Sequence, residues 1–309
     1  MPKLDIAIAG EINLDLILYG LPQQMPTERE LIASKFSITL GSSSAIVVHN
    51  LSALGSRVGF VTKVGDDACG NMALVRVAAS GADISRIVRS ENTLTGITII
   101  LQHEHDRHIL TYLGTISELR FEDLDLAYLT SARHFHLSSL FLQRALQPGV
   151  PELFRRMKKA GLTTSLDTND DPDDQWRGVF DEVLPYVDVL LPNEREAMKM
   201  AHAEDLETAV DRLSQRVKTV AVKLGKRGAM AICDGKRFTA PAAKVDVVDP
   251  VGAGDSFDAG FLHQYVNGSD IQTCLAYGNR CGAFSTTAAG GTEAFRDQVK
   301  LREFLARSG

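Results

Sequence analysis

The run Asp249-Pro-Val-Gly-Ala-Gly-Asp-Ser-Phe-Asp-Ala-Gly-Phe261 decides the fold of this chain. Two glycines flank Ala253, Asp255 follows at once, and apolar residues then recur at helical spacing. Gly252 to Asp255 are therefore expected at the start of a helix, where free N–H groups and the helix dipole bind anions. Beside a phosphoryl group, Asp255 could take the proton of an attacking hydroxyl. The alternative is that Asp255 only caps its helix.

The composition is that of an ordinary globular protein. The chain has 309 residues, of which 44% are hydrophobic and 23% charged. Its net charge of −6 argues against a nucleic-acid or anionic-membrane partner. We expect a cytoplasmic protein, because no membrane span or signal-peptide pattern is present and the four cysteines lack metal or redox spacing.

Short apolar runs alternate with helical patterns along the whole chain, which predicts βαβ units. The expected fold is a three-layer α/β/α sandwich with a mainly parallel central sheet. Residues 13–40 and 95–113 break the alternation with strand patterns, the second around a polar hairpin tip at 103–107. We predict that they form a small β-sheet lid on a main nucleotide- and substrate-binding domain of residues 1–12, 41–94 and 114–309.

The run that begins at Asp249 resembles the second signature of the ribokinase-like (PfkB) carbohydrate kinase family, D-T-x-G-A-G-D-x-F. Pro250 and Val251 depart from that signature. The segment 41–55 resembles the family's first signature, G-G-x-x-x-N-x-A-x-x-x-x-x-L-G, with Ser42 and Ile46 replacing glycine and asparagine. The chain has no Walker A or G-x-G-x-x-G sequence. The resemblance implies a ribokinase-like fold and ATP-dependent phosphorylation of a primary hydroxyl of a small sugar.

Shorter motifs fit the same resemblance. Asn13 and Asp15 share one face of a strand, so a solvated edge strand is the alternative to sugar binding. Asp167-Thr-Asn169 is similar to the family's D-x-N, although Asp171 stands where an arginine is usual. Asn193-Glu-Arg-Glu196 matches N-x-x-E near the metal–triphosphate, and Gly225-Lys-Arg-Gly228 matches a nucleotide loop.

The resemblance implies a role for each group of site residues. Asp255 is the expected general base, and the backbone of Gly252, Ala253 and Gly254 is the expected anion hole. The expected sugar ligands are Asn13, Asp15, Gly41, Ser42 and Ser43. The expected ATP ligands are Asp167, Asn169, Asn193, Lys223, Gly225, Gly228 and Asn279. Glu196 is expected to bind Mg²⁺, directly or through water, and K⁺ is expected near Asp249, Val251, Ser285, Ala288 and Gly290.

The identity of the acceptor stays open. Arg107 is the only obvious arginine of the lid and lies at its hairpin tip, which favours a neutral sugar. A nucleoside or sugar-phosphate kinase of the same family is an alternative, and so is a sensing protein that has lost catalysis. Apolar residues fall on both sides of the lid strands, which predicts a homodimer joined through the lids. They are Leu16, Ile17, Leu18, Ile97, Ile99 and Ile100.

Overall fold

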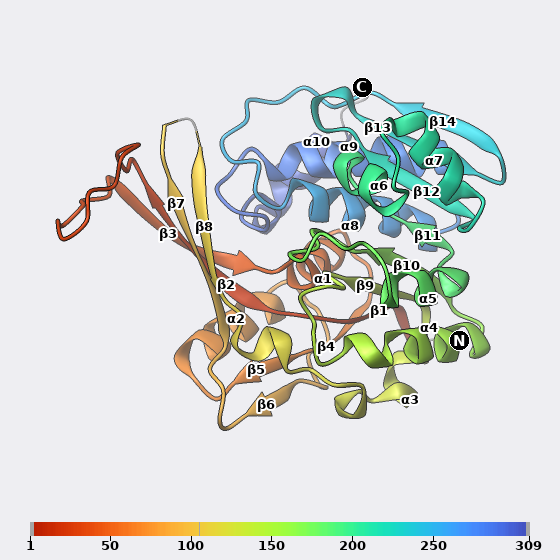
Figure 1. Ribbon diagram of the computed structural model, residues 1–309, viewed down its shortest axis with the longest axis horizontal. Coiled ribbons are helices and arrows are strands. Elements are labelled where there is room, and N and C mark those ends of the chain that lie inside the picture. Colours follow the sequence, from red (N-terminus) through yellow and green to blue (C-terminus); the bar gives the residue numbers. More distant parts are fainter. Residues whose placement is uncertain (1–2, 105, 307–309) are drawn as a thin grey trace.

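The computed structural model describes residues 3–104 and 106–306 (Figure 1). Its central sheet has eight strands in the order β14-β13-β12-β11-β10-β9-β1-β4. Pairing is parallel from β4 to β12, and β12–β13 and β13–β14 are antiparallel. The strands are β1 (Leu4–Ala9), β4 (Val58–Val61), β9 (Ala132–Ser138), β10 (Thr163–Asp167), β11 (Val189–Leu190), β12 (Thr219–Lys223), β13 (Ala229–Cys233) and β14 (Lys236–Ala240).

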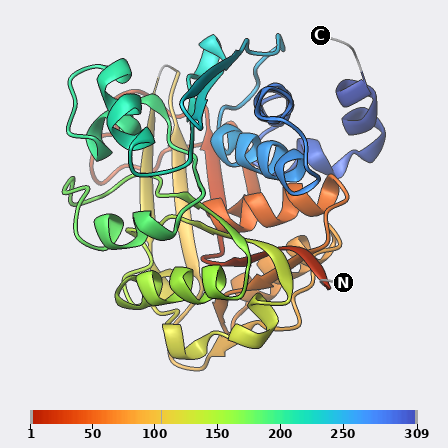
Figure 2. The ribbon, with the colours of Figure 1, turned by 90° about the vertical axis from the view of Figure 1, so that its right-hand side faces the viewer.

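Helices cover both faces of this sheet (Figure 2). Side chains alternate between the faces of a strand, so Ile6 and Ile8 of β1 pack in one core and Ala7 and Ala9 in the other. The isoleucine side carries α1 (Ser43–Ala53), α2 (Ala68–Ala78), α8 (Ala253–Val266) and α9 (Ile271–Ser285), with α10 (Gln298–Ala306) packed on α9. The alanine side carries α3 (Leu126–Leu129), α4 (Val150–Lys159), α5 (Val179–Val183), α6 (Glu194–Met200) and α7 (Leu206–Ser214).

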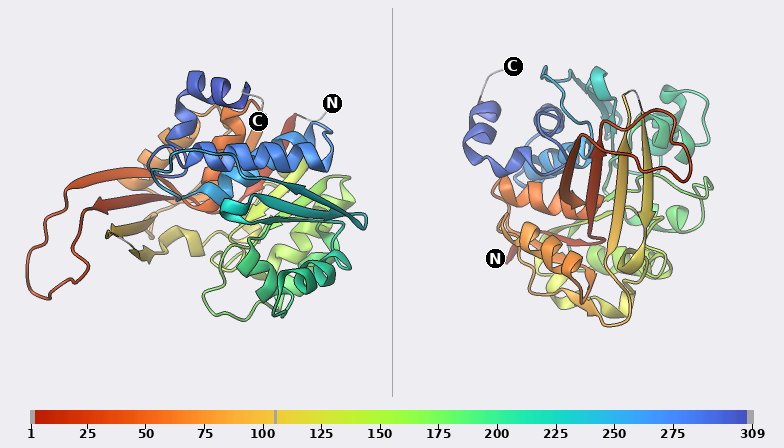
Figure 3. Two further views of the ribbon diagram at one scale, coloured as in Figure 1. Left: turned by 90° about the horizontal axis from the view of Figure 1, so that it is seen from above. Right: turned by 90° about the vertical axis from the view of Figure 1, so that its left-hand side faces the viewer.

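A second sheet of four strands projects from this body (Figure 3). Its order is β3-β2-β7-β8, in which β2 and β7 are parallel and the other pairs antiparallel. We call it the lid. Its strands are β2 (Asn13–Tyr19), β3 (Lys35–Gly41), β7 (Gly96–Gln102) and β8 (Arg107–Tyr112). The predicted three-layer sandwich with a small additional sheet is confirmed, whereas the domain boundaries stay a prediction. His105, in the predicted hairpin tip, lies outside the described residues.

The sequence patterns do not indicate three of the strands or the short helices α3 and α5, and they place the start of the last helix too early. The sequence does not indicate β14, because most of its residues are exposed and form no apolar run. It does not indicate β5 (Lys63–Gly65) or β6 (Val88–Ser90), because three residues are too few for a recognisable pattern. The apolar pattern predicts a last helix over 295–305. Helix α10 instead begins at Gln298 after a 3₁₀ turn, because the side chain of Asp297 accepts from the backbone N–H of Lys300. The 3₁₀ turns are Gly114–Ser117, Phe121–Asp123, Gln147–Gly149, Leu184–Tyr186, Gly225–Arg227 and Ala294–Arg296. Among the described helices, none has the length and apolar character needed to cross a membrane.

Candidate active site

The signature run opens helix α8, as its spacing predicts. Gly252 is the N-cap, with a left-handed φ of 73°, and the helix begins at Ala253. A Cβ on Gly252 would lie 2.4 Å from the Cα of Gly291, so only glycine fits this close approach. Gly254 and Asp255 follow in the first turn, where N–H groups lack intrahelical partners. The local structure therefore combines backbone donors with one carboxylate.

The carboxyl group of Asp255 faces the start of α1. Ser43 Oγ donates to Asp255 Oδ1 at 2.5 Å. Burial raises the pKa of Asp255, the hydrogen bond from Ser43 lowers it, and the charge of Asp167 raises it, with a net value of about 6. A carboxylate with a pKa near neutrality is suited to accept a proton from a hydroxyl group.

The predicted sugar ligands lie together where the lid meets α1. Ser42 Oγ donates to Asn13 Oδ1 at 3.0 Å, and Asn13 Nδ2 donates to Thr98 Oγ1 at 2.8 Å. A Cβ on Gly41 would lie 2.0 Å from Asp15 Oδ1, so the glycine leaves room for that carboxyl group. Burial first, and then the charges of nearby aspartates, raise the pKa of Asp15 to about 7.

Glu11 is a buried carboxyl group that sequence reasoning missed. It accepts from the backbone N–H of Ser44 at 3.1 Å and from Ser44 Oγ at 2.5 Å. Burial raises its pKa above the usual value. Glu11 therefore fixes the first turn of α1 beside Ser43. Its place directly after an apolar strand was the available signal.

A largely buried lysine links the end of β10 to helix α8. Lys223 Nζ lies 2.8 Å from Asp167 Oδ2 and 3.1 Å from Asp258 Oδ2. Burial alone would lower the pKa of Lys223, but the two carboxyl groups outweigh it and raise this pKa. Burial raises the pKa of Asp258 well above its usual value, whereas Lys223 holds that of Asp167 low against the effect of burial.

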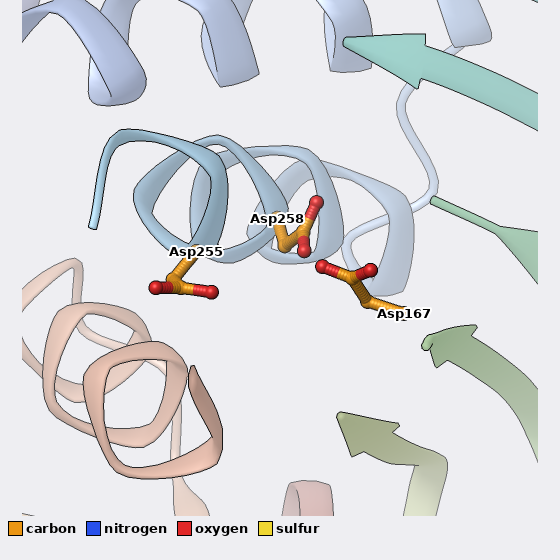
Figure 4. Close-up of side chains that lie close together, drawn as sticks. All are labelled: Asp167, Asp255 and Asp258. Carbon is orange, nitrogen blue, oxygen red and sulfur yellow. The ribbon is translucent and has the colours of Figure 1, made fainter. Parts of the chain in front are cut away.

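Three aspartates converge at this point (Figure 4). Oxygen atoms of Asp167, Asp255 and Asp258 lie within 4.8 Å of one another. Sequence reasoning missed Asp258, although its spacing of three residues from Asp255 places both on one side of α8. The ammonium group of Lys223 thus lies beside a cluster of three carboxyl groups, which extends from the predicted base to the end of β10.

Asn193 and Glu196 meet as predicted, but as partners in a capping box of α6. Asn193 Nδ2 and N donate to the two Glu196 oxygens at 2.5 and 2.8 Å, and Glu196 N donates to Asn193 Oδ1 at 3.0 Å. Burial, and then the charge of Asp167, raise the pKa of Glu196 to about 7. The amide of Asn193 therefore holds this carboxyl group in place.

The segment after β10 is shaped by its own side chains. Asn169, with a φ of 52°, donates from Nδ2 to Ser139 Oγ at 3.2 Å and from its backbone N–H to Asp167 Oδ1 at 3.1 Å. Asp171 accepts from the backbone N–H groups of Asp173, Gln175 and Trp176. At the position where an arginine is usual in the family, the chain thus has a carboxylate that orders the following loop.

A pocket of about 270 Å³ lies beside the start of α8. Among the predicted nucleotide residues, Lys223, Gly225, Gly228 and Asn279 line it, whereas Asp167, Asn169 and Asn193 do not. Asn279 Nδ2 donates to the carbonyl oxygens of Ala240 and Pro241 at 2.9 and 3.0 Å, which holds one wall. Further lining residues are Lys226, Ala242, Ala243, Val245, Val247, Pro250, Ala253, Gly254, Phe257, Gly282, Ala283 and Thr286.

The predicted monovalent-cation residues come from two loops tied together by Asp249. Asp249 Oδ1 accepts from Val251 N and Oδ2 from Gly290 N, each at 3.0 Å. The backbone N–H groups of Val248 and Asp249 donate to the Thr286 carbonyl, between Ser285 and Ala288 in the chain. The structure therefore brings these segments together beside the start of α8.

Comparisons with known proteins agree with this arrangement. Residues 3–298 match the family model described as pfkB family carbohydrate kinase. The ATP-dependent ribose-1-phosphate kinase of Halopiger xanaduensis is 30% identical, with 93% of each chain covered. The 2-dehydro-3-deoxygluconokinase of Bacillus subtilis is 28% identical, with 96% of each chain covered.

Solved structures show the same fold. A putative ribokinase II from E. coli in its apo form has a TM-score of 0.88 at 25% identity, covering 99% of this chain and 100% of that one. Arabidopsis thaliana ribokinase complexed with ribose and ATP has a TM-score of 0.84 at 22% identity, covering 99% of each chain. The chain belongs to the pfkB family of carbohydrate kinases. The predicted ribokinase-like fold and the predicted enzyme class, an ATP-dependent carbohydrate kinase, are thereby confirmed.

Proposed function

We propose that this kinase transfers the γ-phosphoryl group of ATP to a primary hydroxyl of a small sugar, with Asp255 as the general base. The observation that carries the proposal is the partly buried carboxylate in the first turn of α8, held by Ser43 at 2.5 Å and with a pKa raised to about 6. Asp255 takes the proton of the attacking hydroxyl. The N–H groups of residues 252–255 stabilise the charge of the moving phosphoryl group.

ATP is proposed to occupy the pocket beside α8. Small residues of the pocket, such as Gly225 and Gly228, let a nucleotide approach the backbone, and Asn279 lies on the wall proposed for adenine. Asp167, Asn169 and Asn193 lie outside the pocket lining and are proposed to act at the phosphate end. A putative ribokinase II of E. coli, at 24% identity, has been crystallised with ATP and Mg²⁺, which supports the same co-substrate and metal here.

Mg²⁺ fits the carboxyl groups near the phosphate end, because carboxylate oxygens are the ligands that it prefers. Asp167 raises the pKa of Glu196, so two neighbouring carboxylates repel each other and a cation would relieve that repulsion. Both Glu196 oxygens already accept from Asn193, so we propose that Glu196 acts through water. When bound, Mg²⁺ supplies charge neutralisation to the phosphates.

The acceptor is proposed to lie between Asp255 and the lid. Asn13, Asp15, Gly41, Ser42 and Ser43 surround this space and offer carboxylate, amide and hydroxyl groups to sugar hydroxyls. The lid above them excludes water, which would otherwise take the phosphoryl group.

We also propose that K⁺ orders the anion hole and that two copies join through their lids. For K⁺, the support is that Asp249 ties Val251, at the entry to α8, to Gly290. For the dimer, the support is an apolar lid surface that includes Phe36 and Tyr112, each 54% exposed, and Leu110, 53% exposed. An exposed apolar patch of this kind usually meets a partner.

The general base is tested by Asp255→Asn, which is nearly isosteric. We expect turnover to fall about 10²- to 10⁴-fold while ATP still binds, because the amide cannot accept the proton. Asp270→Asn is the matched control: Asp270 caps α9 by accepting from Thr273 N, and asparagine caps equally well. If Asp255→Asn keeps the parent rate with the best sugar, as the control does, Asp255 is not the general base and the mechanism is wrong.

A further inference from the structure

A second pocket, of about 520 Å³, lies on the face of the central sheet that α8 does not cover. It is lined by residues of α5, α6 and α7 and of the turns that flank these helices (Figure 1). Within the described residues, it shares no lining residue with the pocket proposed for ATP. A ligand bound there would therefore not compete directly with ATP.

Positive charge dominates the lining of this second pocket, which we call the arginine pocket. Its charged residues are Arg177, Arg212 and Arg216 together with a single aspartate, Asp181. Asp181 Oδ1 lies 2.9 Å from Arg216 NH2, so this aspartate can balance only one of the three arginines. The whole chain has a net charge of −6, so the local excess is opposite in sign to the overall charge. A pocket lined mainly by one sign of charge concentrates ions of the opposite sign.

Two of the arginines are each held in place through one nitrogen atom. Arg212 NH1 donates to the carbonyl oxygens of Ala201 and His202 at 3.0 and 2.8 Å, which satisfies the end of α6. Arg177 Nε donates to His202 Nε2 at 3.2 Å. Among the described residues, the other guanidinium nitrogens of Arg177 and Arg212 have no hydrogen-bond partner. A guanidinium group carries five N–H donors in a fork that matches phosphate oxygens, so both side chains can bind a phosphate without leaving their positions.

Two segments lead from the proposed phosphate end of the active site to the arginine pocket. The first is 167–177, which begins at Asp167 and ends at Arg177. The second is α6, which has Glu196 in its first turn and ends at the pocket. The residues proposed to act at the phosphates and the lining of the arginine pocket therefore belong to the same two segments.

Three side-chain contacts join these two segments along their length. They are Arg195 with Asp170 at 2.6 Å, Lys199 with Asp174 at 2.7 Å and Arg177 with His202 at 3.2 Å. The side chains of both ion pairs are at least 43% exposed, so these pairs stabilise the arrangement only weakly. A ligand that bridges Arg177 and Arg212 adds a contact between the first segment and the end of α6.

We propose that the arginine pocket is a second ligand site, which binds the phosphate group of a small phosphorylated compound and thereby strengthens the binding of MgATP. Arg177, Arg212 and Arg216 bind the phosphate oxygens. The bound phosphate holds 167–177 against α6, so Asp167 and Glu196 are ordered before MgATP binds. The effect on MgATP rests on the proposed ATP site, whereas binding of phosphate to the pocket does not.

Calorimetric titration with inorganic phosphate tests the site itself. Mg²⁺ and a saturating non-hydrolysable ATP analogue are present, so that the proposed phosphate end is already occupied. We expect about one phosphate per chain with a Kd of about 1 mM or lower. Arg177→Gln and Arg216→Gln should each raise this Kd about 10-fold or more, because each removes a charge-assisted hydrogen bond.

Arg155→Gln is the matched control for these variants. Arg155 is an exposed arginine of α4 that pairs with Glu152 at 2.7 Å, outside the pocket, and its loss should leave the Kd unchanged. Absence of binding, or equal binding by the parent and all three variants, would overturn the proposal. Tighter binding of citrate than of phosphate would overturn the assignment of the ligand as a phosphate.

ADP release tests the coupling to MgATP. Saturating phosphate should lower the KM for MgATP at least about 5-fold relative to potassium chloride at equal ionic strength, with kcat little changed. In Arg177→Gln, the KM without phosphate should equal that of the parent, and phosphate should no longer lower it. A KM that stays constant or rises in the parent, or that falls equally in Arg177→Gln, would overturn the coupling. If no sugar supports ADP release, the proposed function fails, and the titration still decides whether the pocket binds phosphate.

Discussion

Replacing Lys223 by methionine removes the cation between two buried carboxyl groups. Asp167 is 1% and Asp258 0% exposed, and Lys223 Nζ lies 2.8 and 3.1 Å from them. Breaking a buried pair from one side costs about 3–5 kcal/mol, because the remaining charge is uncompensated. Burial raises the pKa of Asp258, whereas Lys223 holds that of Asp167 low, so Asp167 is the carboxyl group whose charge depends most on the lysine. We expect Lys223→Met to lower the free energy of unfolding by that amount at pH 8.

The pH dependence has a definite sign. Without Lys223, burial raises the folded-state pKa of Asp167 above its unfolded value, so the variant is penalised at high pH and recovers as the pH falls through the raised pKa. Adding Asp167→Asn removes the remaining charge and should restore most of the loss at pH 8. Urea unfolding, followed through the buried Trp176, measures these differences at pH 8 and 6.

Lys218→Met is the matched control. Lys218 pairs with Asp234 at 3.7 Å on the surface, where the two side chains are 61% and 67% exposed, so its loss should be at most about 1 kcal/mol. Equal losses for the two lysine variants would refute the reasoning. Failure of Asp167→Asn to rescue Lys223→Met would refute it as well.

Three further properties can be measured directly. Burial raises the pKa of Asp15 from 3.8 to about 7, so folding takes up a proton between these pH values and the stability of the parent falls as the pH rises through them. Asp15→Asn should therefore be more stable than the parent at pH 8, by up to about 4 kcal/mol, and equally stable near pH 4. The same variant should be unable to bind the acceptor. Leu110→Asp should convert a dimer to a monomer in sedimentation at micromolar concentration, with Val299→Asp as control, whereas a monomeric parent would end the lid-to-lid proposal. K⁺ should raise kcat above the value in tetramethylammonium at equal ionic strength, and equal rates would remove the proposed cation site.

Local apolar patterns predict the elements with a clear buried face. They indicate strands over 58–61 and 229–233 and a helix over 194–200, and these ranges agree with β4, β13 and α6. β14 has mostly exposed residues and was not recognised. A strand at the edge of the central sheet lacks the apolar run by which a buried strand is recognised in a sequence.

The site residues that lie within the two signature segments could be predicted from the sequence. Asp255 and Ser43 were named from the two signature segments, and the structure brings them within 2.5 Å. The contact between Asn13 and Thr98 was not predictable, because residues from two strands share a face only once their register is known. Charge partners such as Lys223 and Asp258 likewise depend on how α8 packs against the sheet.

The strand order of the central sheet bears on how the nascent chain avoids aggregation. From β1, the strands β9 to β14 join one side of the sheet in chain order, so each is the open edge until the next is synthesised. β12 presents the buried run Thr219-Val-Ala-Val222, a sequence prone to accept a strand from another molecule. β14 begins with Lys236 and Arg237, and Arg237 pairs with Glu207 and Asp211. Nascent chains that end between β12 and β14 leave this edge unpaired, so we expect them to depend on chaperones more than shorter or longer chains do.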